Sequence, residues 1–417
     1  MLFQIYNIIT ILLIPIYCIV LVARLFLGKE SHQSIMQRFG FGYDMRPEGK
    51  LVWLHAASVG ESMVAVNLVK LLSIKYPCHH FLITTTTISS SKILKQNPHP
   101  NLIHQFVPAD NFLAVKRFIN YWQPCVGIFI ESELWPCLIN ITSKKTKLLL
   151  VNGKLSDISY KLWKKAQFLF NEIISKFEII ITQSDNDLQK FQNLGYHKAI
   201  KLDNLKFING QLAADLDKLL ILRNQIGNKP VLVFASTHLF DENIILKVIS
   251  NLKNKLNYYP ILVPRYPHLS GKITEMCQAL GLSYSLRSKQ QDFIDKDLYI
   301  IDSFSELGLF YRISKAVFVG GSFNGKGHNM IEPAYLDNVI LFGPHVSSFQ
   351  NIADEMIENE AAIQVHNESE LEERIKQIFS TKAEFFDKYA VNALSYVNSK
   401  KANALKTIEY IERYLND

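Results

Sequence analysis

The sequence predicts an α/β protein in which two Rossmann-like domains follow an N-terminal membrane-anchor helix. Short apolar runs rich in β-branched residues alternate with helical patterns in two separate series, which is typical of parallel, doubly wound sheets. The alternation stops over residues 209–228, and the first charged side chain of the chain is Arg24. A chain of 417 residues is long enough for two or three domains, each with its own core.

Residues 1–27 have the composition of a membrane anchor. The segment before Arg24 carries no charged side chain and is long enough to span a bilayer. A cleaved signal peptide would need a basic amino-terminal region, which is absent, and the sequence Leu21-Val22-Ala23 is a poor cleavage site. Because basic residues follow the segment, the positive-inside rule keeps the rest of the chain in the cytoplasm. We therefore expect an uncleaved anchor, either single-pass or monotopic.

The first predicted domain covers residues 28–208. Ser58 is placed to cap the helix that follows the first expected strand. The expected strands of this domain are residues 51–57, 80–87, 127–135, 146–154 and 178–184.

A linker over residues 209–228 leads to a second predicted domain, residues 229–417, which ends in a helical tail from about Glu368. Its expected strands are residues 231–237, 259–265, 298–303, 316–321 and 338–343. Two such domains that face each other form a cleft lined by the carboxyl ends of both sheets. The candidate chemistry should therefore lie at the ends of strands.

Charge and cysteine content limit the classes of partner. The net charge of +7 suits nucleic acid, an anionic membrane surface or an anionic substrate. No arginine-rich run or basic stripe interleaved with aromatic residues occurs, so we expect no nucleic-acid partner. Five scattered cysteines without a C-x-x-C pair indicate reduced thiols in a cytoplasmic protein. The stretch 78–80, "CHH", has no partner cluster, and we predict a surface turn there rather than a metal site.

The stretch "AVFVGGSFNGKGHNMIEPA", residues 316–334, is a near match to the P-loop pattern G-x-x-x-x-G-K-[ST]. Gly327 stands where Ser or Thr would ligate Mg²⁺, so the metal ligand is missing. A strand that runs through glycines into a helix still favours an anion, because free N–H groups and the positive end of the helix dipole attract negative charge. We predict a phosphate loop of another class, with a purely structural strand–turn–helix as the alternative.

Glu61 is the first candidate for chemistry in the amino-terminal domain. It follows a strand and a Gly turn and lies in the first turn of a predicted helix, where the helix dipole stabilises a carboxylate. Ser58 and Glu61 also match the capping-box pattern S-x-x-E. The spacing therefore leaves two roles open, a helix cap and a catalytic base.

Further charged residues follow the next strands of the same domain. Glu131 and Glu133 come directly after an apolar strand, and their side chains should point to opposite faces of an extended chain. One of them is expected to face the cleft and the other to be structural. Lys206 lies near the end of this domain and, considered alone, is a solvated surface lysine.

The second domain offers residues suited to a nucleotide. Arg265 lies between two prolines after a strand, so its guanidinium would be presented rigidly to a phosphate. Ser305 and Glu306 form a capping-box-like pair at a strand-to-helix turn. Asn329 and Glu332 are three residues apart and share a helix face, where a carboxylate can accept from two ribose hydroxyls.

A series of short motifs runs along the chain in the order WLHAASVGE, ESELWP, LKF, STHLFDE, LVPRYP, FVGGS, GHNMIEPA and GPH. The order and approximate spacing resemble the Kdo (3-deoxy-D-manno-octulosonic acid) transferases of lipopolysaccharide biosynthesis, from the N-terminal segment to the tail. The resemblance implies a GT-B fold and inverting transfer of Kdo from CMP-Kdo to a lipid A precursor (lipid IVA), without cofactor or catalytic metal. It also implies work at the cytoplasmic face of the inner membrane.

The resemblance also implies roles for individual residues. Glu61 would be the general base, and Glu131 and Lys206 would stabilise the transition state. The CMP-binding segments would contain Pro264, Arg265, Phe304, Ser305, Glu306, Asn329, Met330, Ile331 and Glu332.

The chain departs from the family pattern in places, with Asp203, Asn204 and Ile208 around the lysine motif and Tyr266 where His is usual. NMIE also stands where Asn-Pro-Leu-Glu is common. Every charged role nevertheless remains filled. A membrane-anchored, transferase-like shell without activity is an alternative that loss of Glu61 or Arg265 would favour, and both are present. A GT-B enzyme that uses a UDP-sugar is the second alternative.

Overall fold

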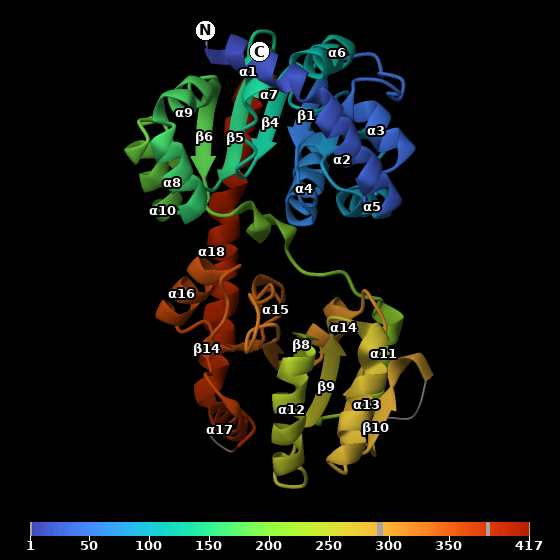
Figure 1. The fold of residues 1–417 in the computed structure, drawn as a ribbon. Helices are drawn as coiled ribbons and strands as arrows, with labels where there is room; N and C mark the ends of the chain where they lie inside the picture. The colour runs from blue at the N-terminus through green and yellow to red at the C-terminus, as the bar shows by residue number, and fades with distance from the viewer. Residues whose placement is uncertain (1, 290–294, 381–383, 417) are drawn as a thin grey trace. The chain divides into compact units, whose positions relative to one another are not determined.

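The computed structural model describes residues 2–289, 295–380 and 384–416, so residues 1 and 417, the outer ends of the expected anchor and tail, lie outside the described part. The chain forms two compact units, residues 1–209 with 401–417 and residues 210–400 (Figure 1). Each unit holds a seven-stranded, entirely parallel sheet with helices packed against it. The predicted two-domain α/β class is confirmed.

The sheet of the first unit has the order β3-β2-β1-β4-β5-β6-β7. Its strands are β1 Leu51–His55, β2 His80–Thr85, β3 Leu102–Phe106, β4 Val126–Ile130, β5 Lys147–Gly153, β6 Phe177–Thr182 and β7 Ile200–Lys201. Its helices are α1 Leu2–Leu12, α2 Ile14–Phe26, α3 His32–Arg38, α4 Val59–Lys75, α5 Ile88–Gln96, α6 Phe112–Trp122, α7 Pro136–Thr142, α8 Asp157–Lys165, α9 Gln167–Ile174, α10 Asp185–Asn193 and the 3₁₀ helix η1 Leu205–Asn209. All five predicted strands are present, and the structure adds β3 and β7.

Polar residues start the helices at the carboxyl edge of this sheet. Each has extended backbone and a side-chain oxygen that accepts a hydrogen bond from an N–H of the first helical turn. These caps are Ser58, Thr87, Asn111, Ser156 and Ser184. Because each capped helix begins at a defined residue after its strand, the residues next to the caps have fixed positions along this edge of the sheet.

The expected anchor of residues 1–27 is two helices rather than one. Segments Phe3–Leu12 and Ile14–Phe26 are bent by 53° relative to each other. Pro15 lies in the first turn of α2, where it cannot donate to the preceding turn and its ring disfavours a continuous helix. In the part of the chain that the structure describes, no single helix is long and apolar enough to cross a membrane; this pair together has the necessary length and composition.

The sheet of the second unit has the order β10-β11-β9-β8-β12-β13-β14. Its strands are β8 Val231–Thr237, β9 Tyr259–Pro264, β10 Tyr284–Leu286, β11 Leu298–Ile300, β12 Ser314–Val319, β13 Val339–Phe342 and β14 Ile363–Gln364. Its helices are α11 Leu216–Ile226, α12 Leu239–Leu252, α13 Ser270–Ala279, α14 Leu307–Tyr311, α15 Ile331–Ala334, α16 Gln350–Glu358, α17 Glu368–Ile378 and the 3₁₀ helices η2 Pro267–Leu269 and η3 Arg287–Lys289, and α18 Glu384–Leu415 leads out of it.

The end of the chain differs from the expected domain boundaries. The sequence placed the whole tail in the second domain, but residues 401–417 belong to the first unit. Ala404, Ile408, Ile411 and Leu415 are buried in the core that lies against α4 and the first sheet. The periodicity of α18 predicts a helix with an apolar face, and that face contains no information about which sheet it will cover. The expected linker also contains a regular helix, α11.

Candidate active-site residues

Glu61 lies at the start of α4, directly after β1, and is 7% exposed. Its Oε1 accepts from the Ser58 hydroxyl at 2.7 Å and its Oε2 from the Ala57 N–H at 2.8 Å, while Ser58 Oγ accepts from the Glu61 N–H at 3.3 Å. Burial raises the pKa of Glu61, the hydrogen bonds from Ser58 and Ala57 oppose this, and the charges of Glu131 and Glu133 raise it further. The residue therefore closes the helix start and has a carboxyl group whose pKa is raised.

Glu131 and Glu133 follow β4, the strand that pairs with β1. Glu131 has left-handed backbone (φ 64°), which ends the strand earlier than predicted, and its N–H donates to the Val151 carbonyl at 3.1 Å. The Trp135 indole N–H donates to Glu133 Oε2 at 2.6 Å, and His55 Nε2 lies 3.8 Å from the same oxygen. Burial opposes ionisation of Glu133, but His55 and Trp135 outweigh it and lower the pKa of this carboxyl.

Lys206 belongs to η1, which packs against α4. Its N–H donates to Asn204 Oδ1 at 2.9 Å, and the neighbouring Leu205 N–H donates to Asn152 Oδ1 at the end of β5. The half-buried lysine is therefore positioned by strand ends, rather than lying on a fully solvated surface.

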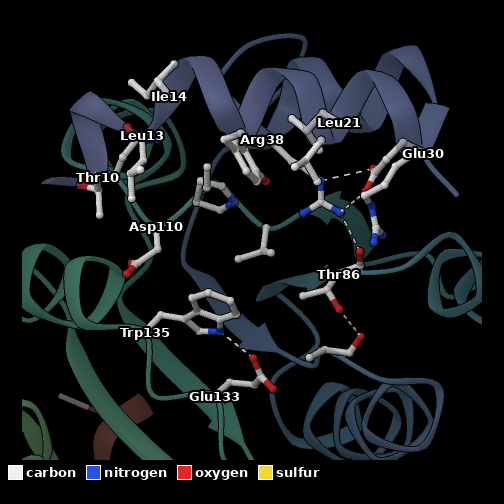
Figure 2. A pocket seen from close by; sticks show the side chains of 18 of the residues that line it. Thr10, Leu13, Ile14, Leu21, Glu30, Arg38, Thr86, Asp110, Glu133 and Trp135 are labelled. Carbon is white, nitrogen blue, oxygen red and sulfur yellow. Dashed lines mark hydrogen bonds and ion pairs between the residues drawn. The ribbon is translucent and has the colours of Figure 1, made fainter. Parts of the chain in front are cut away.

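A cavity of about 620 Å³ lies in the same unit, beneath the bent helix pair (Figure 2). Its apolar wall comes from α1 and α2, and Figure 2 shows Glu133 and Trp135 on the opposite side. The residues that line it include Ala57, whose N–H donates to Glu61. Near its other end, Glu30 forms ion pairs with Arg24 (3.1 Å) and Arg38 (3.0 Å), and Arg38 also donates to the Thr86 carbonyl.

Arg265 follows β9 in the second unit and is exposed. His238 and His328 lie stacked nearby, with their Nε2 atoms 2.8 Å apart and Tyr266 edge-on to His238. Burial, together with the charges of His238 and Arg265, lowers the pKa of His328 to about 4. His328 is therefore neutral at physiological pH, and Arg265 carries the positive charge at the end of β9.

The glycine loop after β12 differs from its predicted form in two ways. No helix follows directly, because α15 begins only at Ile331 and is four residues long. The N–H groups of Gly321 and Phe323 donate to the two oxygens of buried Asp241, at 2.7 and 3.1 Å. A protein carboxylate thus occupies donors that a phosphate loop would offer, and the helix-start part of the prediction is wrong.

Glu306 lies at the end of the loop after β11 and is the residue before α14. Its carboxylate accepts from Arg287 through Nη2 at 2.9 Å and Nε at 3.3 Å, and from the Ser303 hydroxyl. Burial opposes ionisation, but the Arg287 and Ser303 hydrogen bonds lower the pKa of Glu306. The expected cap pair of Ser305 and Glu306 does not form: Ser305 is exposed in left-handed backbone (φ 65°), and Ser303 is the partner.

Asn329 Nδ2 donates to Glu332 Oε1 at 2.9 Å, although the two do not share a helix face, since α15 begins only at Ile331. Burial raises the pKa of Glu332, whereas Asn329 and the charge of Arg265 lower it, so the Arg265 guanidinium and this carboxylate influence each other. Between them, the side chains of Met330 and Ile331 are buried, which leaves only their backbone for a ligand.

The last two predicted donor-site residues differ in exposure. Pro264 is buried at the end of β9, whereas Phe304 is 70% exposed. An exposed aromatic ring beside a nucleotide site can offer a stacking face. Among the described residues, no group of three or more His, Cys, Asp or Glu is arranged to hold a metal ion.

Comparison with known proteins decides the family. Residues 33–209 match the family model of 3-deoxy-D-manno-octulosonic-acid transferase (kdotransferase). The chain is 40% identical over 414 residues to the 3-deoxy-D-manno-octulosonic acid transferase of Rickettsia bellii, covering 99% of both chains, and 30% identical to that of Haemophilus influenzae, covering 85% of each. The chain belongs to the 3-deoxy-D-manno-octulosonic acid transferase family. The predicted resemblance is confirmed, and membership makes this protein a Kdo-transferring glycosyltransferase.

Solved structures agree on the fold of this Kdo transferase. A glycosyltransferase from Rickettsia africae shares 15% identity, covers 89% of this chain and 100% of its own, and superposes with a TM-score of 0.60. At that identity the similarity supports the two-domain, GT-B-like fold alone.

Several residues of this Kdo transferase site were not predicted. His55 and Asp241 were within quoted motifs but were assigned no role, and Arg287 was not considered. Each contacts a residue distant in sequence. His55 lies beside Glu133, Asp241 accepts hydrogen bonds from the glycine loop, and Arg287 forms an ion pair with Glu306. The available signal for Asp241 was an acidic residue in an otherwise apolar stretch, which needs a partner if it is buried; it lies in the first turn of α12 and is 1% exposed.

Proposed function

We propose that this Kdo transferase moves Kdo from CMP-Kdo to a lipid A precursor such as lipid IVA, with inversion at the anomeric carbon and Glu61 as general base. The observation that carries the proposal is the state of Glu61. It is nearly buried, held by two neutral donors, and raised in pKa by burial and by neighbouring carboxylates. A carboxylate oxygen accepts more than one hydrogen bond, so each Oε can still receive a substrate proton.

The proposed reaction is a single displacement. Glu61 takes the proton of a primary sugar hydroxyl of the acceptor while that oxygen bonds to the anomeric carbon of Kdo. The bond between this carbon and the phosphate oxygen of CMP breaks on the opposite side, so the configuration inverts. Glu131 and Lys206 would stabilise the charges that develop around the reacting carbon and its oxygens.

The donor half of the proposal rests on the second unit. Arg265 is exposed, fixed by a proline on each side and available for a charge-assisted contact with the CMP phosphate. The Asn329–Glu332 pair would bind the ribose hydroxyls, and the Arg287–Glu306 ion pair would hold the loop that presents Phe304. All of these groups are protein donors and acceptors, and no step needs a metal.

The N-terminal helix pair supports attachment to the cytoplasmic face of the inner membrane. Large apolar side chains are exposed along both helices: Ile5, Ile8, Ile9, Leu12, Ile16, Ile19, Val22 and Phe26. Since Tyr6 and Leu21 of the same helices contact the body of the unit, an in-plane, monotopic attachment fits this arrangement better than a free spanning helix.

The test is a transfer assay on the full-length protein in detergent or vesicles. We expect CMP-Kdo and lipid IVA to give a product heavier by one or more Kdo units in mass spectrometry, and Glu61→Gln to form it at least about 100-fold more slowly under the same conditions. A UDP-sugar donor serves as the second arm, since GT-B folds also use UDP-sugars. Transfer from the UDP-sugar but not from CMP-Kdo would overturn the proposal.

A further inference from the structure

A single carboxylate joins the hydrophobic N-terminal helix to a helix beside the active site. The Tyr6 hydroxyl of α1 donates to Asp110 Oδ2 at 2.6 Å. The backbone N–H groups of Leu138 and Cys137 in α7 donate to the same carboxylate, at 2.7 and 3.3 Å. Three donors from two distant parts of the chain therefore converge on Asp110.

Helix α7 depends on this carboxylate because it has no cap of its own. The residue at its N-cap is Trp135, whose side chain caps nothing, and Pro136 follows as the first helical residue. Free N–H groups in a first helical turn need an acceptor. Asp110 supplies it from the loop after β3, and Tyr6 holds Asp110 in place.

The segment fixed by this cap is the one that carries two active-site carboxylates. Glu131 and Glu133 lie between the end of β4 and the start of α7. One end of the segment is held by the Glu131 N–H bond to Val151, and the other end is the turn that Asp110 caps. The left-handed backbone of Glu131 is a conformation that persists only when both sides constrain it.

The same helix pair also forms a wall of the 620 Å³ cavity. Tyr6 lines this cavity, together with Asp110, Glu133 and Trp135, which Figure 2 labels. Helix α1 packs against α7 and α6, and Phe3 and Tyr6 pack against the core that contains Cys137 and Leu138. The helix pair is thus linked by packing and by the Tyr6–Asp110 hydrogen bond to the loop that carries Glu131 and Glu133.

We propose that Tyr6 and Asp110 are positioning residues, through which the N-terminal helix pair holds the Glu131–Trp135 loop in the geometry needed for Kdo transfer. This inference rests on the proposed roles of Glu61 and Glu131. It makes transfer, but not CMP binding, sensitive to how α1 is seated.

The first test is Tyr6→Phe in the full-length protein, which removes one hydroxyl and keeps the ring. We expect kcat for Kdo transfer to fall by about 10- to 100-fold, because small misplacements of reacting groups have effects of this size. CMP affinity should stay unchanged. The matched control is Tyr196→Phe, which removes a buried tyrosine hydroxyl bonded to the Phe177 carbonyl at 3.3 Å in the same unit. It should lower Tm to a similar extent without slowing transfer.

The second test is a readout that needs no substrate. Trp135 is 41% exposed and bonded to Glu133, whereas Trp53 and Trp122 are fully buried. Iodide quenching, taken as the difference between proteins with Trp135 and with Trp135→Phe, should increase in Tyr6→Phe and remain at the wild-type level in Tyr196→Phe. Because no acceptor is present, an effect here cannot come from a lost contact between Tyr6 and substrate.

The third test is a double-mutant cycle with Asp110→Asn. If Tyr6 acts through Asp110, the double variant should lose no more transfer than Asp110→Asn alone. Multiplied losses, or a Tyr6→Phe protein that matches Tyr196→Phe in kcat and quenching, would overturn the inference. A wild-type protein that fails to transfer Kdo would overturn the proposed function instead, and the quenching experiment would still decide the positioning role.

Discussion

Two glutamates at helix starts, one in each unit, share the local pattern S-x-x-E and have opposite electrostatics. Glu61 follows Ser58, its partners are a hydroxyl and a backbone N–H, and neighbouring carboxylates raise its pKa beyond the effect of burial. Glu306 follows Ser303, its main partner is the Arg287 guanidinium at 2.9 Å, and its pKa is lowered although burial opposes this. The local pattern is the same, and the tertiary partners decide the chemistry.

The difference in partners and pKa is the one expected between a reactive carboxylate and a structural one. A base must exchange its proton during turnover, which suits neutral partners and a raised pKa. A carboxylate with a bidentate arginine partner remains ionised and keeps its geometry. We therefore expect Glu61 to act on the reaction and Glu306 to act on the shape of the donor loop.

The largest effect should come from exchanging each glutamate for glutamine. Glu61→Gln can still fill the helix start, but an amide cannot take the proton, so transfer should fall by about 100-fold or more while Tm and CMP affinity remain near wild type. Glu306→Gln should show the reverse: about 1–3 kcal/mol of lost stability, weaker CMP binding, and near-normal kcat at saturating donor. An active Glu61→Gln enzyme would end the proposed mechanism.

The next effect is expected at Arg265. Arg265→Ala should weaken CMP binding by about 10- to 100-fold, because a charge-assisted hydrogen bond to phosphate is lost. Arg223→Ala is the matched control, since Arg223 lies in the same unit and its guanidinium donates to the Arg312 carbonyl at 3.3 Å. Calorimetric titration of CMP into both variants checks the prediction, and equal affinity in the two would remove Arg265 from the phosphate site.

The fold was predictable from the sequence because strand periodicity and caps are local. The runs at Leu51–His55 and Val231–Thr237 are wholly apolar or β-rich, and Ser58 marks the start of α4 as expected. The break in the N-terminal helix was not predicted, because a proline such as Pro15 is tolerated in a continuous apolar helix and the packing of α1 against α6 and α7 is visible only in the folded chain.

The position of a site residue was predictable only where the local sequence around that residue indicates a strand end or a helix start. Glu61, Arg265 and the Asn329–Glu332 pair lie directly after a strand or at the start of a helix, positions that the sequence spacing indicates. Asp241 and Arg287 could not be assigned, because their partners are about 80 and 19 residues away and only the folded sheet brings them together. The glycine loop was misjudged for the same reason, since its N–H groups already bind Asp241.

A smaller effect should distinguish the sugar of the nucleotide. If Glu332 accepts from the ribose hydroxyls, the wild type should prefer CMP to 2′-deoxy-CMP by a few-fold to about tenfold, which corresponds to one net hydrogen bond. Glu332→Ala should bind both nucleotides with similar, weaker affinity. Asn329→Ala, which removes the donor to Glu332, should reduce the preference partly. A wild type that is indifferent to the sugar would exclude the ribose role.

The smallest effect, and the sharpest for the contrast between the two glutamates, is a shift of the pH profile. The base must be ionised, so kcat/KM should fall as pH falls through the pKa of Glu61 in the free enzyme, which is raised above that of an ordinary glutamate. Glu131→Gln removes a nearby negative charge that raises this pKa. The acid limb should therefore move to lower pH, whatever the loss in maximal rate. Glu306→Gln, in contrast, should leave the limb in place, because Glu306 lies in the other unit and its charge is compensated by Arg287.

The pH dependence of folding stability should also follow from the direction of each pKa shift. Since the folded pKa of Glu61 is raised, its favourable contribution is present at low pH and is lost as pH rises through that pKa, whereas the contribution of Glu306 is lost as pH falls. Rate profiles and Tm measured on the three proteins between pH 4 and 8 check both halves. An acid limb that does not move in Glu131→Gln would mean that a group other than Glu61 takes the proton.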